Sequence, residues 1–392
     1  MSDQGSLPLK VMYLLNGLGT GGAERSLTDL IPLLRAREID LIIVCLFKRS
    51  IGVQSGVLAT TEVHFLEGGS WLGRIRGTRR LLRRLRPNLL HTTLFESDIV
   101  GRFAAIGTGI PVLSSLVNTS YDNARLQVDP QLRKNRVLAA RWLDGWTARH
   151  LAVRFHALTT AVKDAGVRQL GLSPQRITVI GRGRDLTRLG EASPVRRLHV
   201  RAGLGLPATD EVVLTVGRHE FQKGQIFLIE AMAELRQQRE HLRLLIAGRE
   251  GNATSQLAEA IHRLGLGNHV SLLGHRADIG DLLAAADVFC FPSVYEGFGG
   301  AAIEAMALGT PIVASDLPAL REVIGDTAIF VPSQSAPALA GAIRDLLENP
   351  SLGQSLASAA KVRVKQHFSL DQIAGEMARL YREVAGYGRR TV

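Results

Sequence analysis

Short apolar segments alternate with longer amphipathic ones along the whole chain of 392 residues, and this alternation restricts the fold more than any other feature. The apolar segments predict buried strands, because a strand covered on both faces has no polar side. The amphipathic segments predict helices, so the chain should form parallel sheets with helices on both faces. The first predicted strands are Lys10–Leu15, Leu41–Phe47, Leu89–Thr93, Val112–Leu116, Leu158–Thr160 and Ile177–Ile180.

The series of predicted strands stops and then starts again, which indicates two α/β domains. The break lies between residues 183 and 193, so we predict one Rossmann-like domain over residues 1–183 and a second over 184–369. Residues 370–392 follow with apolar side chains at helical spacing, and such a helix could pack on either domain. The strands predicted in the second domain are Val212–Val216, Leu242–Ala247, Val270–Leu273, Val288–Phe291, Ile312–Ala314 and Ala328–Val331.

Composition and charge narrow the class of protein. Both cysteines, Cys45 and Cys290, lie in apolar segments, which is typical of buried residues in a protein of the reducing cytoplasm. The sequence has no basic and apolar leader and no apolar run of membrane length, so export is not expected and a cytoplasmic location is predicted. The net charge of +11 comes from arginines spread over the whole chain, which favours a basic solvated surface, and no nucleic-acid partner is predicted.

The segment Leu72–Arg86 leaves two interpretations open. Its apolar side chains form one stripe, and most of the remaining positions are arginine. A helix of this kind can lie on an anionic membrane. A single apolar stripe is also what packing on a sheet requires. We expect an ordinary helix that precedes the strand Leu89–Thr93, and peripheral contact with the inner face of the membrane is the alternative.

A glycine-rich loop follows the first predicted strand. Residues 17–22 read Gly-Leu-Gly-Thr-Gly-Gly and match the pattern G-x-G-x-x-G, so a nicotinamide or flavin oxidoreductase is one hypothesis. That hypothesis requires an acidic residue at the end of the second strand, whereas Glu38 and Asp40 precede this strand. The loop still predicts a backbone that approaches an anion closely, at the N-terminus of a helix that begins near Ala23.

Two cations follow the first strand of the second domain. Arg218 and Lys223 are five residues apart, in a loop that leads into a helix beginning near Gly224. A guanidinium fork and a mobile ammonium group together suit a diphosphate whose charge grows as a bond breaks. A solvated basic loop is the alternative for this motif alone.

Two carboxylates follow the strand Val288–Phe291. Glu296 lies in the loop after the strand, and Glu304 lies about one turn into the next helix on the same side. Gly299 and Gly300 leave amide groups at the start of this helix free to receive phosphate oxygens. The chain has no Asp-x-Asp and no cluster of His and Asp at ligand spacing, so no metal site is predicted.

These motifs resemble those of the family-four retaining glycosyltransferases, which have the GT-B fold of two Rossmann-like domains facing across a cleft. The resemblance covers nearly the whole chain. It rests on residues 21–25, 217–224 and 296–316. The last run is the most specific, because Glu-Gly-Phe-Gly, Glu-Ala-Met-Ala, Gly-Thr-Pro and Ala-Ser-Asp occur in this order and spacing.

The resemblance implies roles for the donor-site residues. The donor would be a nucleoside diphosphate sugar, with UDP or GDP as the nucleotide and without any other cofactor. Arg218 and Lys223 would bind its diphosphate during catalysis, Glu296 would bind the sugar hydroxyls, and Glu304 would bind the ribose. Arg249, His275 and Arg276 would lie near the base. The remaining donor contacts implied are Gly21, Gly22, Gly217, Phe298, Gly299 and Gly300.

The acceptor side departs from the pattern of the family. Many members carry a histidine in the loop after the strand Val112–Leu116, whereas this chain has Asn118 there. We therefore name Asn118 and His91 as the acceptor-side candidates. The interdomain Asn-Gly-Val-Asp of the family is replaced by Arg-Gly-Arg-Asp at residues 182–185. In the family the C-terminal helix crosses back to the N-terminal domain, so we expect residues 370–392 to pack there.

The resemblance implies transfer of the sugar to a glycan, lipid-linked or small-molecule acceptor, with retention of configuration and without a metal ion. The acceptor would attack from the same face as the departing diphosphate, whose oxygen would take the acceptor's proton. Three alternatives stay open. They are another GT-B chemistry such as that of a nucleotide-sugar epimerase or a phosphorylase, an inactive module that binds sugar nucleotides, and the oxidoreductase.

Overall fold

A computed structural model describes residues 8–19, 21–48, 59–66, 69–130 and 132–388 of the chain. Its contacts group these residues into two units. Unit 1 comprises the described residues within 1–121, 133–183 and 369–392, and unit 2 comprises those within 122–132 and 184–368. The segment 122–132 thus groups with unit 2, whereas the predicted boundaries place it in the first domain, residues 1–183.

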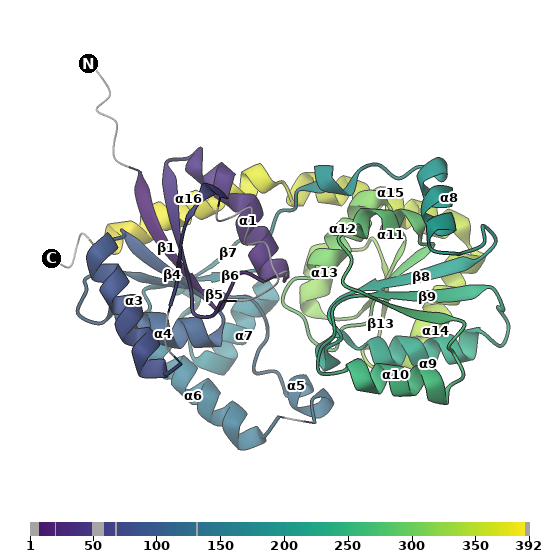
Figure 1. Cartoon of the computed structure of the whole chain (residues 1–392), viewed down its shortest axis with the longest axis horizontal. Coiled ribbons are helices and arrows are strands. Elements are labelled where there is room, and N and C mark those ends of the chain that lie inside the picture. Colours follow the sequence, from purple (N-terminus) through teal and green to yellow (C-terminus); the bar gives the residue numbers. More distant parts are fainter. Residues whose placement is uncertain (1–7, 20, 49–58, 67–68, 131, 389–392) are drawn as a thin grey trace, which may run out of the picture. The chain divides into compact units, whose positions relative to one another are not determined.

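Unit 1 is built on a seven-stranded parallel sheet with the strand order β3-β2-β1-β4-β5-β6-β7 (Figure 1). The order reverses between β1 and β4, as in doubly wound folds, so the carboxyl ends of these two strands are where such a sheet binds ligands. The strands are β1 (Leu9–Leu15), β2 (Ile39–Cys45), β3 (Glu62–Phe65), β4 (Leu89–Thr93), β5 (Val112–Leu116), β6 (Arg154–Ala157) and β7 (Ile177–Val179).

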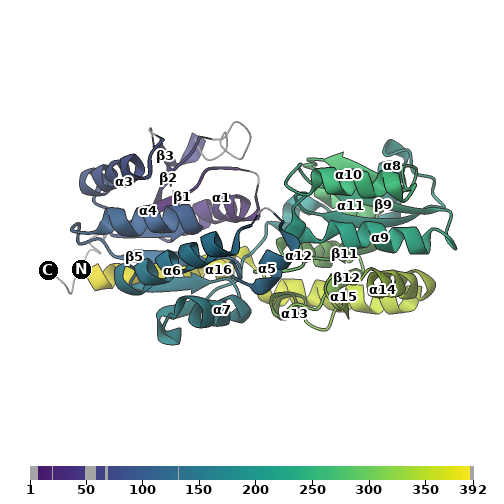
Figure 2. The same ribbon diagram turned by 90° about the horizontal axis from the view of Figure 1, so that it is seen from below.

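Helices cover both faces of this sheet. The helices are α1 (Gly22–Arg35), α3 (Trp71–Leu85), α4 (Phe95–Ala105), α6 (Lys134–Leu151), α7 (Thr160–Leu170) and α16 (Leu370–Gly388). One apolar cluster joins the sheet to α1 and α16, and another joins it to α3, α4, α6 and α7. Helix α4 lies between α3 and α6 (Figure 2). The two clusters show that side chains from both faces of the strands are removed from water.

Helix α16 returns from the end of the chain to unit 1. Its apolar side packs beside α1 through Ile373, Met377 and Val384. The buried Tyr381 on the same side shares a hydrogen bond with Nδ1 of His91 in β4, at 2.8 Å. Packing and this polar contact together tie the last helix to the first sheet.

Unit 2 is built on a six-stranded parallel sheet with the order β10-β9-β8-β11-β12-β13. This order has its reversal between β8 and β11, so the carboxyl ends of these strands form the ligand-binding edge expected for the second sheet. The strands are β8 (Glu211–Val216), β9 (Leu242–Ala247), β10 (Val270–Gly274), β11 (Val288–Phe291), β12 (Ile312–Ser315) and β13 (Ile329–Val331).

The helices of unit 2 also form two layers. One apolar cluster joins its sheet to α9, α10 and α14, while α11, α12 and α15 lie on the opposite side of the sheet in Figure 1. The helices are α5 (Asn123–Val128), α8 (Pro194–Gly203), α9 (Gln225–Leu235), α10 (Thr254–Arg263), α11 (Ile279–Ala285), α12 (Gly300–Leu308), α13 (Pro318–Ile324), α14 (Ala336–Glu348) and α15 (Pro350–His367). None of the helices in the described residues is both long and apolar enough to span a bilayer.

The predicted fold class, two parallel-sheet α/β domains, is confirmed, but two strands of unit 1 differ from the prediction. The predicted strand Leu158–Thr160 is wrong, because β6 ends at Ala157 and Thr159 caps the N-terminus of α7. The strand β6 was missed because the polar residues Arg154 and His156 interrupt its apolar run. The edge strand β3 was missed because only four residues, half of them polar, form it.

The arginine-rich segment forms helix α3, which packs on the sheet as expected. Leu82 is fully buried, and Ile75 and Leu85 pack against the same cluster. Ser70 caps the N-terminus of the helix by accepting a hydrogen bond from the amide of Gly73, at 3.1 Å. Arg86 ends the helix in the left-handed conformation, with φ of 45°. The apolar stripe is therefore used for packing inside unit 1.

Candidate functional site

Two loops meet at the carboxyl edge of the unit 2 sheet. One follows β8 and runs through a 3₁₀ turn, η3 (Phe221–Lys223), into α9. The other follows β11 and leads into α12. Because β8 and β11 are neighbours in the sheet, side chains from the two loops reach each other there.

Lys223 and Glu296 form the central ion pair of these loops. The distance from Lys223 Nζ to Glu296 Oε2 is 2.6 Å, and the two side chains are 23% and 12% exposed. Oε1 of Glu296 accepts a hydrogen bond from the amide of Gly297 at 3.2 Å. The lysine ammonium also lies 5.3 Å from the ring centre of Phe291, which supplies a cation–π contact. Both charges are thus held at the sheet edge while staying accessible to a solute.

Glycine at position 224 allows the two loops to approach this closely. Gly224 has φ of 61°, and a Cβ atom there would lie 2.1 Å from the carbonyl oxygen of Pro292. Two further contacts join the loops, from Val294 N to Gln222 O at 2.8 Å and from Gln222 Nε2 to Tyr295 O at 3.0 Å. The Lys-Gly pair of the sequence motif therefore has a mechanical reason, because the glycine lets the lysine loop seat against the glutamate loop.

Arg218, the first cation of the motif, is exposed and bonds to a neighbouring acid. Its Nη1 lies 2.7 Å from Oε1 of Glu220, and its side chain is 57% exposed. Gly217 precedes it at a close crossing, because a Cβ atom on Gly248 would lie 1.9 Å from the Gly217 carbonyl oxygen. Arg218 is thus free to turn toward an anion, whereas Lys223 is already positioned.

Glu304 is buried in the second turn of α12, next to a cation that the sequence motifs did not assign. Nε of Arg184 lies 3.6 Å from Oε1 of Glu304, and both side chains are less than a tenth exposed. A Cβ atom on Gly300 would lie 2.2 Å from Nη2 of Arg184, so a larger residue there would displace the guanidinium. The one available signal was the replacement of the family's interdomain motif by a pair of arginines.

The N-terminus of α12 points its first amide groups at the same edge. Its N-cap is Gly299, with φ of 90°, and no side chain caps it. Phe298, the residue before it, is buried and packs edge-on against Phe368. An N-terminus without a side-chain cap has free amide groups and a positive dipole end, which together favour an anion. The phosphate contacts of Gly299 and Gly300 stay a prediction.

The residues predicted near a base lie at the ends of β9 and β10. The amide of Gly248 donates to the carbonyl of Gly274 at 2.8 Å, which joins the two loops. Arg249 is half-buried and His275 is exposed. Arg276 binds Asp278 through two nitrogens, and this hydrogen bond lowers the pKa of Asp278 and raises that of Arg276. Arg276 is therefore already paired.

His219 occupies the interior behind the lysine loop. It is 1% exposed, and burial lowers its pKa. Its Nδ1 lies 3.3 Å from Oγ1 of Thr254, and its amide donates to Arg249 O at 3.0 Å. This placement makes His219 a neutral support for the loop between Arg218 and Lys223.

The glycine-rich loop of unit 1 reaches the end of β1. Gly21 is the N-cap of α1, and a Cβ atom there would lie 2.4 Å from Oε2 of Glu24. Thr20 of the same motif lies outside the described residues. Leu94, at the end of the neighbouring β4, has φ of 75°, which is strained for a leucine. Nothing in the sequence motifs predicts this strained position, because it arises where β4 turns into α4.

The two acceptor-side candidates lie in different surroundings. His91 is 1% exposed, and both of its ring nitrogens are bonded, Nδ1 to Tyr381 and Nε2 to Ser115 Oγ at 2.7 Å. Burial, with a smaller effect of His156, holds the pKa of His91 well below its usual value. Asn118 is half-buried in the loop after β5 and accepts from the amide of Thr119 at 2.8 Å. Only Asn118 is placed where a solute could reach it.

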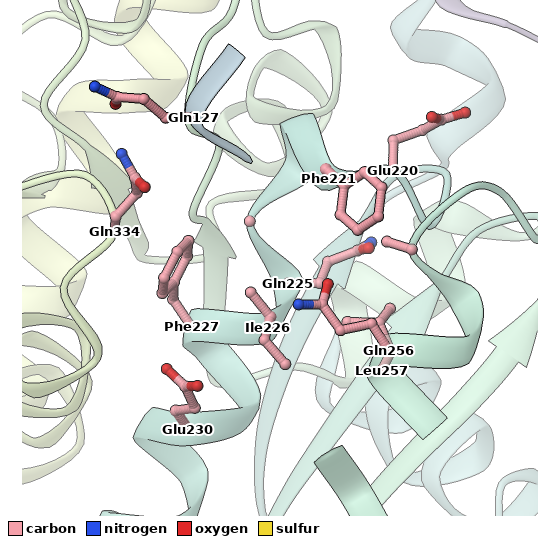
Figure 3. A pocket seen from close by; sticks show the side chains of 12 residues that line it. Gln127, Glu220, Phe221, Gln225, Ile226, Phe227, Glu230, Gln256, Leu257 and Gln334 are labelled. Carbon is pink, nitrogen blue, oxygen red and sulfur yellow. The ribbon is translucent and has the colours of Figure 1, made fainter. Parts of the chain in front are cut away.

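A separate hollow of about 260 Å³ adjoins the lysine loop (Figure 3). Its wall contains Phe221 and Gly224 from that loop, but it does not include Lys223, Glu296 or Glu304. The site predicted from the sequence is therefore distinct from this hollow. Across the described residues, no group of three His, Cys, Asp or Glu side chains is placed to hold a metal ion.

Both halves of the chain match known families of glycosyltransferases. The family described as "Glycosyl transferases group 1" matches residues 197–363, and the "Glycosyl transferase 4-like domain" matches residues 21–183. The phosphatidyl-myo-inositol mannosyltransferase of Mycobacterium leprae is 32% identical over 385 residues, which cover 86% of this chain and 95% of that protein. The D-inositol 3-phosphate glycosyltransferase of Rhodococcus opacus is 33% identical over 315 residues, covering 75% of this chain and 67% of that protein.

The solved structures agree with the fold. The crystal structure of Anabaena Alr3699/HepE in complex with UDP-glucose has a TM-score of 0.81 and covers 96% of this chain and 100% of that one, at 24% identity. The sucrose-phosphate synthase of Thermosynechococcus elongatus gives 0.80, with 96% and 99% coverage at 23% identity. The two-domain GT-B architecture predicted from the sequence motifs is confirmed by these structures.

Proposed function

Because the chain belongs to the glycosyl transferases group 1 family, we propose that it moves a sugar from a nucleoside diphosphate to an acceptor hydroxyl with retention of configuration and without a metal ion. The observation that carries the proposal is the Lys223–Glu296 pair beside the uncapped N-terminus of α12. A cation, a dipole and a carboxylate converge there, and together they match a diphosphate joined to a polyhydroxyl ring.

Lys223 would act on the leaving group. During transfer the bond between the anomeric carbon and the diphosphate oxygen breaks, and negative charge grows on that diphosphate. An ammonium group fixed at the sheet edge, with Arg218 free to turn inward, stabilises this charge without the reorganisation that water would need. The amide groups at the start of α12 add donors of fixed direction. These cationic groups take the place that a divalent ion has in other transferases.

Glu296 would bind the sugar. It is oriented by Lys223 and by the amide of Gly297, and its remaining lone pairs can accept from sugar hydroxyls. The acceptor hydroxyl would attack the anomeric carbon from the face that the diphosphate leaves, and its proton would pass to the departing diphosphate oxygen. The new bond then has the configuration of the old one, and no side-chain nucleophile is needed.

Glu304 would bind the ribose of the nucleotide. In the structure its carboxylate lies near Arg184, so a ribose would have to share the carboxylate with the guanidinium or displace it. If the ribose displaces the guanidinium, Arg184 competes with the nucleotide for the carboxylate of Glu304. We infer that the base lies toward Arg249 and His275, at the ends of the next strands of the same sheet edge.

Two relatives suggest the chemistry of donor and acceptor. HepE of Anabaena is described with UDP-glucose, and the Mycobacterium leprae relative by its name acts on phosphatidyl-myo-inositol. We propose UDP- or GDP-linked hexoses as donors, and polyols, glycans or lipid-linked sugars as acceptors.

The test is donor turnover in the presence of excess EDTA, with the anomer of the product assigned by proton NMR. UDP- and GDP-hexoses would be screened first by thermal shift, since a ligand at 100 times its dissociation constant stabilises the fold by about 2.7 kcal/mol. We expect turnover that EDTA does not reduce and a product with the donor's configuration. Activity that disappears with EDTA and returns with Mg²⁺ or Mn²⁺ would contradict the metal-free mechanism, and an inverted product would contradict retention.

A further inference from the structure

All three tryptophans of the chain lie on the outer sides of two helices of unit 1. Trp71 begins α3 and is 43% exposed, and Trp142 and Trp146 in α6 are 68% and 38% exposed. Tryptophan is usually largely buried in globular proteins, so a chain that exposes every one of them is unusual. Leu72 and Leu138 on the same two helices are about half exposed as well.

Helix α6 exposes large apolar side chains and buries polar ones, the reverse of an ordinary surface helix. Leu138, Trp142 and Trp146 are spaced four apart, so they form one stripe that faces outward. The buried side of the helix carries only small or polar residues, namely Asp144, Gly145, Thr147 and Ala148.

The interior of unit 1 fixes this orientation. Nη1 of Arg102 in α4 lies 2.6 Å from Oδ1 of Asp144 and 3.1 Å from Oγ1 of Thr147, while the Tyr121 hydroxyl donates to the other oxygen of Asp144 at 2.9 Å. Rotating the helix to hide its tryptophans would break this buried ion pair, which costs several kcal/mol. The apolar stripe is therefore held in solvent by the fold itself.

Basic residues greatly outnumber acidic ones along the two helices that carry the tryptophans. Residues 71–86 contain no Asp or Glu, and the only acid in residues 131–151 is the buried Asp144. Helix α4, between the two helices, is mostly buried, so the outer surface of this layer is formed by α3 and α6. The exposed cations are Arg76, Arg80, Arg83, Arg84 and Arg86 on or next to α3, and Arg133, Lys134 and Arg136 at the start of α6.

We propose that this surface, the tryptophan face, docks onto the interface of an anionic phospholipid bilayer. We define it as Trp71, Leu72, Leu138, Trp142 and Trp146 with the eight exposed cations just named. Tryptophan rings favour the headgroup region, where an apolar body and a polar N–H are both satisfied, and Lys and Arg are attracted by the negative surface potential. The proposal concerns a surface of unit 1 and does not depend on the proposed function.

Charge favours a lipid partner over a second copy of the chain. Two tryptophan faces brought together would place cations against cations, which is unfavourable. Helix α8 of unit 2 provides the internal contrast. It exposes Val195 and Leu198, but its arginines at 196, 197 and 201 are each paired with an acid, Asp281 or Asp287. Exposed apolar side chains thus occur in both units, but only around those of unit 1 do the exposed cations form no ion pair within the part of the chain that the structure describes.

The experiment is co-sedimentation of the full chain with two kinds of phosphatidylcholine vesicles. One kind contains phosphatidylglycerol as about one lipid in three, and the other contains no anionic lipid. Tryptophan emission of the same samples reports on the tryptophan face alone, because the chain has no other tryptophan. We expect binding to the anionic vesicles, a blue shift of the emission and quenching by lipids brominated near the headgroup. Sedimentation equal to that with phosphatidylcholine alone, or emission unchanged by anionic vesicles, would overturn the proposal.

Three variants separate the contributions. Trp142→Ser with Trp146→Ser should lower the partition coefficient about tenfold or more through lost apolar insertion. Replacing Arg133, Lys134 and Arg136 by glutamine should lower it by about fivefold for each charge, with the loss shrinking in high salt. The matched control Val195→Ser with Leu198→Ser should bind as the parent does.

Folding of each variant is checked by its thermal midpoint and by far-UV circular dichroism. A lower partition coefficient in the control as well, or concentration-dependent dimers that the tryptophan variant alone abolishes, would contradict a lipid surface. Because quenching by brominated lipid is measured on the unchanged chain, the proposal remains testable if a variant fails to fold.

Discussion

Each unit contains a cation held by carboxylates, and the two sites differ in burial. In unit 1, Arg102 is 1% exposed and bonds Asp144, Thr147 and Ser114, with Asp98 3.8 Å away. In unit 2, Lys223 binds Glu296 at the carboxyl edge of a sheet, and about a fifth of the lysine side chain is exposed. The first site is enclosed by its neighbours, although Nη2 of Arg102 has no hydrogen-bond partner among the described residues, whereas the second is partly exposed at a sheet edge.

Electrostatics inside unit 1 reflect this closure. Burial raises the pKa of Asp98 to about 7, an effect that Arg102 only partly offsets. A buried carboxylate that resists ionisation belongs to the packing of the domain, because no solute can reach it. The comparison teaches that a partly exposed ion pair at a strand end, such as Lys223–Glu296, offers its charges to a solute, whereas the enclosed pair of Arg102 and Asp144 does not.

The largest effect is expected from Arg102→Ala. It would leave Asp144 buried without its cation, so we expect the free energy of unfolding of unit 1 to fall by about 3–5 kcal/mol. Urea unfolding followed by tryptophan fluorescence measures this, since the three tryptophans lie in unit 1. Arg344→Ala, which removes a half-exposed pair with Glu234, is the control and should be close to the parent. Equal losses in both variants would erase the distinction between enclosed and accessible pairs.

Lys223→Ala should leave unfolding nearly unchanged and lower the turnover number by about 10²–10³-fold, the loss expected when one preorganised charge on the transition state is removed. Steady-state kinetics with a sugar nucleotide and the urea midpoint of the variant provide the two measurements. Lys365→Ala, an exposed lysine of α15, is the matched control. A variant that loses stability without losing turnover would assign Lys223 to the same class as Arg102.

Glu304→Ala and Glu296→Ala should separate nucleotide binding from sugar binding. Removing Glu304 should weaken nucleoside diphosphate and sugar nucleotide alike, by about 1.5–3 kcal/mol if both ribose hydroxyls bond the carboxylate. Removing Glu296 should spare the bare diphosphate and lower turnover of the sugar nucleotide. Calorimetry with UDP measures the difference. If both variants weakened UDP equally, the assignment of ribose to one carboxylate and sugar to the other would be wrong.

The smallest effect concerns the acid stability of unit 1. Burial lowers the pKa of His156 to about 4, from a usual value of 6.5. Below pH 6.5 the unfolded chain binds a proton that the folded state refuses, so unfolding becomes easier as the pH falls. The loss between pH 7 and pH 5 should be about 2 kcal/mol for this group.

The His156 contribution is tested by His156→Gln, which keeps a hydrogen-bonding group but cannot titrate. Urea midpoints of parent and variant would be compared at pH 7.5 and pH 5, again through tryptophan fluorescence. The variant should depend less on pH even if it is less stable at both values. An unchanged pH dependence would show that His156 is accessible to protons in the folded state.

Many of the strands could be predicted from the sequence, because apolar runs and glycines are local features. The runs in β4, β5, β9 and β11 were predicted with the residue bounds that the structure shows. The strand β6 was misplaced because its polar side chain, His156, is satisfied by Ser115 and by the carbonyl of Ile180, partners that are 41 and 24 residues away. A buried polar residue looks like a loop residue until its partner is known.

The sequence by itself determined the residue types of the proposed donor site and their order, because the motifs Arg-x₄-Lys-Gly and Glu-x₇-Glu are short and contiguous. Only the tertiary structure decided that Lys223 bonds Glu296, 73 residues away, and that Arg184 stands beside Glu304. It also enclosed His91, a candidate site residue, within hydrogen bonds to Ser115 and Tyr381. The physical reason is that the identity of a residue fixes the chemical groups that it carries, whereas pairing and burial depend on contacts between distant segments. Those contacts form only when the chain folds.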